Sequence, residues 1–409
     1  MTILVTKNKN QEAVLWSAYI VGSEVLFRMS KGLIFYEFPK YMVFIFLLTG
    51  LIVEKKKQNI SLIYLIYILL LLFGITFSDI PYPESIRTNI IFNLSGPILL
   101  GLCAIYFYKR KISIELLLKI LKYMSLPIIS MASYIYLKVP NLESIVFGGV
   151  SSTLASGGYG PNQVATILGV GVFILSLYII ISKKYSGFFI IDVFLLIFLF
   201  FRALITLSRG GVITAILAIL LFSFIYLLSK KNNFIRMTKY FSFLIILSIP
   251  IWLYTSSVTD GMVDNRYANK NARGVLKKDI SAGRIDIFKA EWNGFIENPF
   301  FGIGVGTGKF VRGEELGLRS ASHNEMSRLL GEHGALGLIM IFILFFVPIV
   351  TMNKQTLRSR AFLSAFLLFW FLTVNHSAMR LAMPAFIYGL AVITIVNNKE
   401  IIIVKSVPE

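Results

Sequence analysis

The sequence predicts an all-α polytopic membrane protein, and three observations carry that prediction. Of its 409 residues, 56% are hydrophobic and 15% are charged, whereas soluble domains usually contain about 25% charged residues. The mean hydropathy is +0.75. Apolar stretches of about 18 residues or more recur along the chain, and each is long enough to cross a hydrocarbon core of ~30 Å as a helix.

About 12 transmembrane helices are expected from these stretches. They lie near residues 13–27, 39–53, 60–78, 88–108, 114–137, 161–182, 187–206, 210–229, 237–256, 325–350, 360–374 and 379–397. The first is the weakest candidate, because it is short and contains Glu24.

Basic residues gather in every second connection between the predicted spans. They are Lys7, Lys9, Lys55, Lys56, Lys57, Lys109, Arg110, Lys111, Lys183, Lys184, Lys230, Lys231, Arg236, Lys239, Lys354, Arg358, Arg360 and Lys399. The positive-inside rule places these connections and both termini in the cytoplasm. The net charge of +19 is therefore interpreted as a topology signal and as contact with anionic membrane lipids. No nucleic-acid-binding element is recognisable, so nucleic acid is not an expected partner.

One connection is far longer than the others and divides the chain into three parts. Residues 1–256 hold the first nine spans, residues 257–322 form a large extracytoplasmic loop, and residues 323–409 hold the last three spans. Long loops cross the membrane largely regardless of their charge, so the basic residues of this loop do not contradict the topology.

Within the loop, "SAGRIDIFKAEWNGFIENP" predicts an amphipathic helix along the outer membrane surface. Apolar residues recur at helical spacing, with Ser281 as the N-cap and Pro299 as the stop. The glycine-rich "GIGVGTG" at 302–308 follows. Its backbone N–H groups could cradle a phosphate, but it lacks the Lys-Ser/Thr ending of a P-loop, and glycine-rich turns are common.

The segment "SHNEMSRLLGEHG" at 322–334 places a histidine where the tenth predicted span begins. Ser322 and Glu325 fit a capping box, which predicts one continuous helix to Val350 with His323 at its first position. Such a helix exceeds the hydrocarbon thickness, so His323 is expected at the outer membrane surface. A helix N-terminus disfavours imidazolium, which suits a general base. The alternative is an exposed polar residue at a helix cap.

Two arginines are expected at the same outer surface as His323. Arg209 begins the eighth span, and Arg284 opens the loop helix. Guanidinium groups bind phosphate through two parallel hydrogen bonds, and a helix N-terminus also favours anions. The alternative is that these side chains reach toward lipid headgroups. Arg202 lies deeper in an apolar run, where a charge is costly and is often functional, unless it also reaches outward.

Neither a metal site nor a cofactor is expected. The single Cys103 lies in an apolar run, and His333 and His376, although on the outer side, have no third ligand at usable spacing. The outward loops also lack a tight Asp-x-Asp cluster that would hold a divalent cation.

The motif "SHNEMSRLLGEHGALG" resembles the signature of the O-antigen ligase and O-antigen polymerase superfamily. The matching positions are His323, Asn324, Gly334 and Gly337. "LSRGG" around Arg209 and "AGRIDIFKAEW…ENPFFGIGVG" resemble the flanks of that family's large periplasmic loop. The resemblance covers residues 160–350 by motif and the whole chain by topology.

The resemblance implies a GT-C-like fold and a metal-independent, inverting membrane glycosyltransferase of the bacterial inner membrane. It implies transfer of a glycan from an undecaprenyl-pyrophosphate carrier to an acceptor hydroxyl at the periplasmic face. His323 would be the base, and Arg209 and Arg284 would bind pyrophosphate. The supporting residues would be Asn324, Arg202, Glu325 and His376.

An O-antigen ligase with a lipid A-core acceptor is the first expectation from the resemblance. An O-antigen or exopolysaccharide polymerase, which extends the chain on the carrier, is the alternative. A transporter or flippase would also have many spans, but it should show inverted repeats and broken helices and needs no such loop. A membrane scaffold would explain the hydrophobicity but not three reactive residues on one surface.

Overall fold

The computed structural model describes the chain except for residues 55–59, 140, 144, 230–232, 280, 282, 318, 320 and 397–409. The lysines at 55–57, 230, 231 and 399, which support the predicted topology, lie outside the described residues. The helices are α1 (Thr2–Thr6), α2 (Glu12–Met29), α3 (Phe38–Val53), α4 (Leu62–Phe73) with the 3-10 turn η1 (Gly74–Phe77), α5 (Ile86–Phe107), α6 (Ile114–Lys138), α7 (Pro161–Ile180), α8 (Phe189–Ile205), α9 (Arg209–Leu228), α10 (Asn233–Val258), α11 (Met262–Tyr267), α12 (Arg284–Glu297), α13 (Gly308–Leu316), α14 (Glu325–His333), α15 (Ala335–Asn353), α16 (Leu357–Ser377) and α17 (Met383–Leu390).

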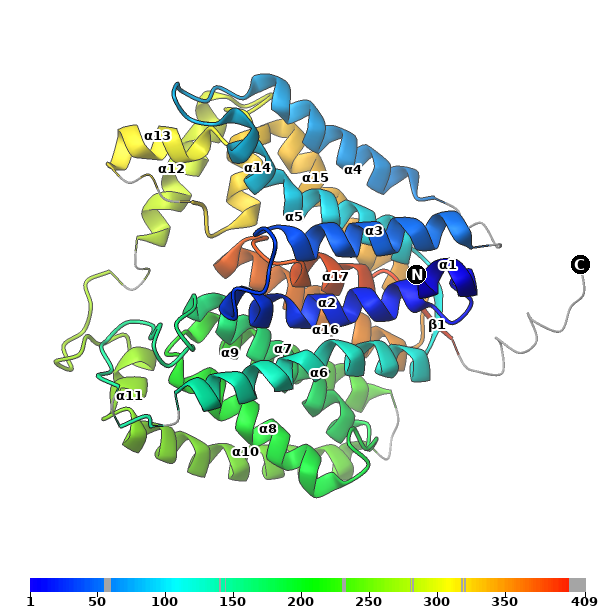
Figure 1. The fold of residues 1–409 in the computed structure, drawn as a ribbon, viewed down its shortest axis with the longest axis vertical. Coiled ribbons are helices and arrows are strands. Elements are labelled where there is room, and N and C mark those ends of the chain that lie inside the picture. The colour runs from blue at the N-terminus through cyan, green and yellow to red at the C-terminus, as the bar shows by residue number, and fades with distance from the viewer. Residues whose placement is uncertain are drawn as a thin grey trace, which may run out of the picture.

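The long helices run side by side in one bundle, with α11, α12 and α13 at one end of it (Figure 1). Six helices of the described chain are long and apolar enough to cross a membrane: α5, α7, α9, the 241–258 part of α10, α15 and α16. This confirms the prediction of an all-α membrane protein. The expected number of 12 is not supported by length and composition, because the other predicted spans are shorter or contain more charged residues.

The last predicted span, 379–397, is wrong as a single helix. Only α17 is helical there, and at about 1.5 Å per residue it is too short to cross a membrane alone. The chain continues as strand β2 (Thr394–Val396), which pairs in parallel with β1 (Lys111–Ser113). Ala391, Val392 and Ile393, which link α17 to β2, are fully buried. Non-helical backbone at this depth is tolerated because protein surrounds it.

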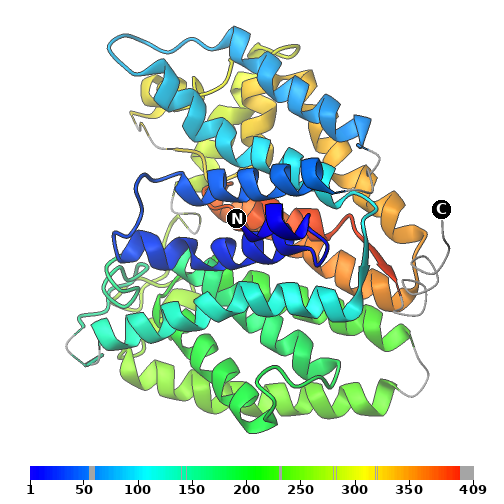
Figure 2. The ribbon, with the colours of Figure 1, turned by 45° about the vertical axis from the view of Figure 1, so that its right-hand side comes forward.

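Close helix packing places the start of α9 against its neighbours. A Cβ atom on Gly211 would lie 2.3 Å from the carbonyl oxygen of Ala165 in α7, and one on Gly210 would lie 2.4 Å from His376 in α16. Only glycine permits such an approach. The two glycines that follow Arg209 therefore allow α7 and α16 to pack closely against the start of α9. Figure 2 shows the helices of the bundle from a second direction.

Polar contacts gather at both ends of the bundle. At one end, Arg110 pairs with Glu54 at 2.7 Å and donates a hydrogen bond to Gln11 at 2.8 Å, and we call this end the opposite end. At the other end, which we call the site end, Lys277 donates to the carbonyl of Gly149, and Ser152 N donates to the carbonyl of Thr206 at 2.8 Å. The site end carries α11 to α14 and the connection between α16 and α17.

The predicted loop helix is present as α12. It begins at Arg284, after Gly283, and ends before Pro299. Ser281 is not the residue that directly precedes the helix, although its Oγ accepts a hydrogen bond from Ile285 N at 3.3 Å. One face packs on α13 and α14, whereas the opposite face exposes Ile285, Phe288, Trp292 and Ile296. The helix is therefore amphipathic, and its position at a membrane surface stays a prediction.

Candidate active site

His323 lies just before helix α14, not inside it. The N-cap is Asn324, whose Oδ1 accepts hydrogen bonds from Met326 N at 2.9 Å and Ser327 N at 3.3 Å. Ser322 instead exchanges hydrogen bonds with the backbone of Asn324. The capping-box prediction was wrong because the Asn324 side chain reaches two free amides of the first turn, which makes it the better cap.

The predicted continuous helix from 323 to 350 is also wrong, because the chain breaks at Gly334. Gly334 has φ of +61° and ψ of −133°, a backbone conformation open mainly to glycine, and it ends α14 before α15 begins. A Cβ atom there would also lie 2.7 Å from Gly302 N. On either side of the break, a Cβ at Gly331 would meet Glu291 O at 2.8 Å, and one at Gly337 would meet Leu329 O at 2.1 Å. These three glycines therefore permit close packing around the break.

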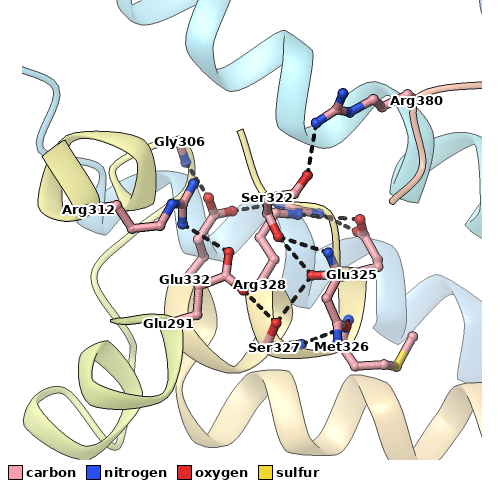
Figure 3. A network of polar contacts seen from close by, with 11 residues as sticks. Glu291, Gly306, Arg312, Ser322, Glu325, Met326, Ser327, Arg328, Glu332 and Arg380 are labelled. Carbon is pink, nitrogen blue, oxygen red and sulfur yellow. Dashed lines mark hydrogen bonds and ion pairs between the residues drawn. The ribbon is translucent and has the colours of Figure 1, made fainter. Parts of the chain in front are cut away.

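A buried network of charged groups holds α14 against the rest of the loop (Figure 3). Arg328 pairs with Glu325 and, at 2.5 Å, with Glu332. On the neighbouring α12, Glu291 pairs with Arg312 of α13 at 2.9 Å and accepts a hydrogen bond from Ser327. Burial raises the pKa of Glu291, and Arg312 opposes this effect. Glu325, expected as a supporting residue, belongs to this buried network.

The glycine-rich segment 302–308 does not leave its amides free for a phosphate. Four successive N–H groups donate within the protein: Ile303 to Gly331 O, Gly304 to Glu332 O, Val305 to Gly74 O and Gly306 to Glu332 Oε1. Phosphate cradling by these amides was therefore the wrong interpretation. The segment serves instead to connect α14 with the end of α4.

Residues 378–382 connect α16 with α17 and form hydrogen bonds to the backbone of Ser322 and His323. Ala378 N donates to the carbonyl of His323 at 3.1 Å, and Arg380 Nη2 donates to the carbonyl of Ser322 at 3.2 Å (Figure 3). From α2, Glu24 accepts a hydrogen bond from Ala382 N at 2.7 Å. Glu24 made residues 13–27 the weakest of the spans predicted from the sequence. The hydrogen bond from Ala382 N and the ion pair with Arg28 provide partners for the Glu24 carboxylate inside the bundle.

Arg209 is held at the start of α9 by a hydrogen bond to an uncharged side chain. Its guanidinium donates to Asn269 Oδ1, and Arg266 Nε donates to the carbonyl of Leu207 at 3.0 Å. Burial lowers the pKa of Arg266, and the nearby charges of Arg209 and Arg284 lower it further. These three arginines therefore lie within electrostatic reach of one another.

Arg284 connects this group of arginines with His323. Burial lowers the pKa of Arg284, as do the charges of Arg209 and Arg380. Within the described part of the chain, no ion pair joins Arg209, Arg266, Arg284 or Arg380 to a carboxylate. The structure thus places the predicted Arg284 within electrostatic reach of both Arg209 and His323, and it adds Arg266 and Arg380 to this group.

The His323 imidazole is half-buried, and its environment keeps it neutral. Burial is the largest cause that lowers the pKa of His323 to about 4, followed by the charges of Arg380, Arg284, Arg312 and His376. The predicted direction was correct, but burial and arginines produce the effect instead of a helix N-terminus.

His376 and Arg202 occupy different surroundings. His376 Nδ1 lies 2.8 Å from the carbonyl of Leu372, which can only accept, so in the neutral ring Nε2 is left as an acceptor facing Thr166 Oγ1 at 3.2 Å. Arg202 is 1% exposed, so the alternative that its side chain reaches outward is wrong. Its Nε and Nη2 find no hydrogen-bond partner among the described residues. No contact links Arg202 to His323 or to the other arginines in the described part of the chain.

Arg266 and Arg380 were missed as site residues. Arg380 had one signal, since it is an isolated arginine in a connection on the side that carries few basic residues. Arg266 had none, because its place depends on how the start of the long loop folds onto Leu207. His333 is fully buried beside Gly74 and does not face the site. No group of three or more metal-ligating side chains was found among the described residues.

Fold and site together define a multi-pass α-helical membrane protein with an arginine-rich site at one end of its bundle. Residues 193–342 match the family model described as O-antigen ligase, and this segment includes Arg209, Arg284 and His323. This match supports the resemblance to the O-antigen ligase and polymerase superfamily that the motifs predicted. Comparison with curated proteins and with solved structures gave no match.

The buried network predicts that Arg328→Met destabilises the protein strongly, because Glu325 and Glu332 would lose their buried partner. Breaking such a pair typically costs about 3–5 kcal/mol. Thermal unfolding in detergent measures the effect, with Arg319→Met as the matched control. The Arg319 side chain is 68% exposed, and its ion pair with Glu84 is long at 3.9 Å, so Arg319→Met should change stability little. Equal unfolding temperatures for the two variants would show that the network does not hold α14.

Proposed function

We propose that this protein transfers a glycan from an undecaprenyl-pyrophosphate carrier to an acceptor hydroxyl, as an O-antigen ligase acting on a lipid A-core acceptor. One observation carries the proposal. The charges of Arg284 and Arg380 act on a half-buried His323, and Arg209 and Arg266 lie within electrostatic reach of Arg284. None of these four arginines has a carboxylate partner among the described residues. A group of guanidiniums that no acid neutralises suits a diphosphate, and a neutral imidazole beside it suits a base.

In the proposed reaction, the acceptor oxygen attacks the anomeric carbon while its proton moves to the His323 imidazole. The bond from that carbon to the pyrophosphate oxygen breaks, and the electron pair leaves with the pyrophosphate. Arg209 and Arg284 stabilise the charge that develops on it. Because the acceptor enters opposite the leaving group, a single displacement inverts the anomeric configuration.

Donor binding would also strengthen the base. The pKa of about 4 for His323 applies to the site without a donor, where burial and the charges of nearby arginines lower it. A bound diphosphate brings opposite charge to those arginines, so the pKa of His323 should rise toward neutrality in the complex. The base would therefore become effective when the donor is present, and it would accept a proton less readily in the empty site.

We place the site end in the periplasm and the protein in the bacterial inner membrane, with twelve crossings in all. The support is the distribution of lysines in the sequence. The segment 383–396 supports a final crossing as well, because it runs from the Arg380 connection at the site end to Arg110 and β1 at the opposite end. On this placement the exposed aromatic face of α12 would rest on the membrane surface.

The residue roles predict different kinetic defects. His323→Ala should lower turnover about 10²–10⁴-fold while the protein still binds lipid-linked donor, because base catalysis acts in the transition state. Arg209→Lys and Arg284→Lys should weaken donor binding as well, since lysine lacks the two-pronged guanidinium. Transfer and donor binding by purified protein are measured, with Lys289→Ala on the exposed side of α12 as the control. A folded His323→Ala protein with near-normal turnover would exclude the histidine from the mechanism.

Transfer should not require a divalent cation, because permanently charged arginines can neutralise the leaving pyrophosphate. Purified protein with lipid-linked donor and acceptor is therefore expected to keep its rate in excess EDTA. Loss of activity in EDTA and its recovery on addition of magnesium or manganese would contradict the proposed role of the arginines.

The envelope glycans of a deletion strain distinguish a ligase from a polymerase. Loss of a ligase should leave full-length chains on the lipid carrier, because polymerisation continues without attachment to lipid A-core. Electrophoresis of lipopolysaccharide and analysis of extracted carrier lipids measure this distribution. Single repeat units attached to lipid A-core would instead assign the protein as a polymerase.

A further inference from the structure

The 378–382 connection is held in a constrained conformation. Ala378 has φ of +50°, which a residue with a Cβ atom rarely adopts. A strained residue persists where surrounding contacts fix it, and such residues concentrate at functional sites. Here the amide of Ala378 donates to the carbonyl of His323. The strain therefore occurs at the point where this connection contacts the proposed base.

Side chains of helix α2 hold the backbone of the 378–382 connection. Arg28 Nη2 donates to the carbonyl of Arg380 at 3.3 Å, and Glu24 accepts from Ala382 N at 2.7 Å. Arg28 and Glu24 pair with each other at 2.6 Å. Helix α2 thus contacts the backbone of Arg380, whereas the Arg380 side chain contacts the segment that carries His323.

The Arg380 side chain makes one defined contact and leaves part of its guanidinium unused. Its Nη2 donates to the carbonyl of Ser322 at 3.2 Å, directly before His323 (Figure 3). Its Nε is buried and has no hydrogen-bond partner among the described residues. No carboxylate pairs with it in the described chain, so no ion pair neutralises the charge that it directs at the imidazole.

We propose that Arg380 is a positioning residue for His323. It fixes the His323 loop through the carbonyl of Ser322 and uses its charge to keep the imidazole in the neutral form that accepts a proton. This inference rests on the proposed role of His323 as the base. Arg284, Arg312 and His376 are the other groups whose charge acts on His323, and Arg380 has the largest such effect.

The test is the pH dependence of kcat/KM for purified protein, which reports the free-enzyme pKa of the base. Because the base is active when neutral, activity should fall as the pH drops through that pKa. Arg380→Gln removes the repelling charge and should move this acid limb upward by about one pH unit. Arg380→Lys keeps the charge and should leave the limb in place while lowering kcat, since the guanidinium contact is lost. Arg273→Gln, which changes an exposed arginine of the long loop 257–322, is the control.

A second measurement separates charge from folding. In a Cys103→Ala background, Arg380→Cys is modified after purification with either a neutral methyl or a positively charged aminoethyl thiosulfonate reagent. The charged adduct should return the acid limb toward its wild-type pH, and the neutral adduct should not. Identical limbs for both adducts, or for wild type and Arg380→Gln, would overturn the inference.

Failure of this inference differs from failure of the proposed function. If His323→Ala abolishes transfer but the Arg380 variants leave the limb unmoved, His323 remains the base and Arg380 has a structural role only. If His323→Ala retains transfer, the proposed function itself fails, whatever the Arg380 variants do.

Discussion

The buried pairing of Arg328 with Glu325 and Glu332 is the interaction on which the site end depends. Charges removed from water are tolerated only when they are paired and hydrogen-bonded, so these side chains permit few alternative arrangements. Glu332 also binds the amide of Gly306, and Ser327 binds Glu291 of α12. Through these contacts the glycine-rich segment, α12 and α14 become one unit. Arg284 and His323 lie at its edges, and their separation is therefore set by the scaffold.

Two groups of arginines in this protein differ in the chemistry of their partners. Arg28, Arg110, Arg312 and Arg328 each pair with a carboxylate, which neutralises them within the fold. Arg209, Arg266 and Arg380 are instead held by uncharged oxygens: Asn269 Oδ1, Leu207 O and Ser322 O. Neutral acceptors fix the geometry of a guanidinium without cancelling its charge. The positive potential at the site end is thus preserved for an anionic ligand, and the mutual repulsion of these arginines is compensated by the rigid scaffold around them.

Features that depend on local composition could be predicted from the sequence, and features that depend on tertiary contacts could not. The predicted span 161–182 corresponds to α7 at Pro161–Ile180, because a long apolar run in a membrane protein has few alternatives to a helix. His323, Arg209 and Arg284 stood out because polar residues are rare beside such runs. The break at Gly334 was missed because it depends on the approach of Gly302, which is distant in sequence. For the same reason the amides of 302–308 looked free. Arg266 and Arg380 were not recognised as site residues, because their partners Leu207 and Ser322 are distant in sequence.

The central claim is that the unneutralised arginines at the site end bind the diphosphate of a lipid-linked donor beside His323. Electron cryo-microscopy of the protein in lipid nanodiscs with undecaprenyl pyrophosphate tests it most directly. The account predicts density for two phosphate groups within hydrogen-bond distance of the Arg209 and Arg284 guanidiniums, with the His323 imidazole facing the position of the anomeric carbon. Diphosphate density elsewhere on the protein, with these arginines contacting only protein or solvent, would contradict it.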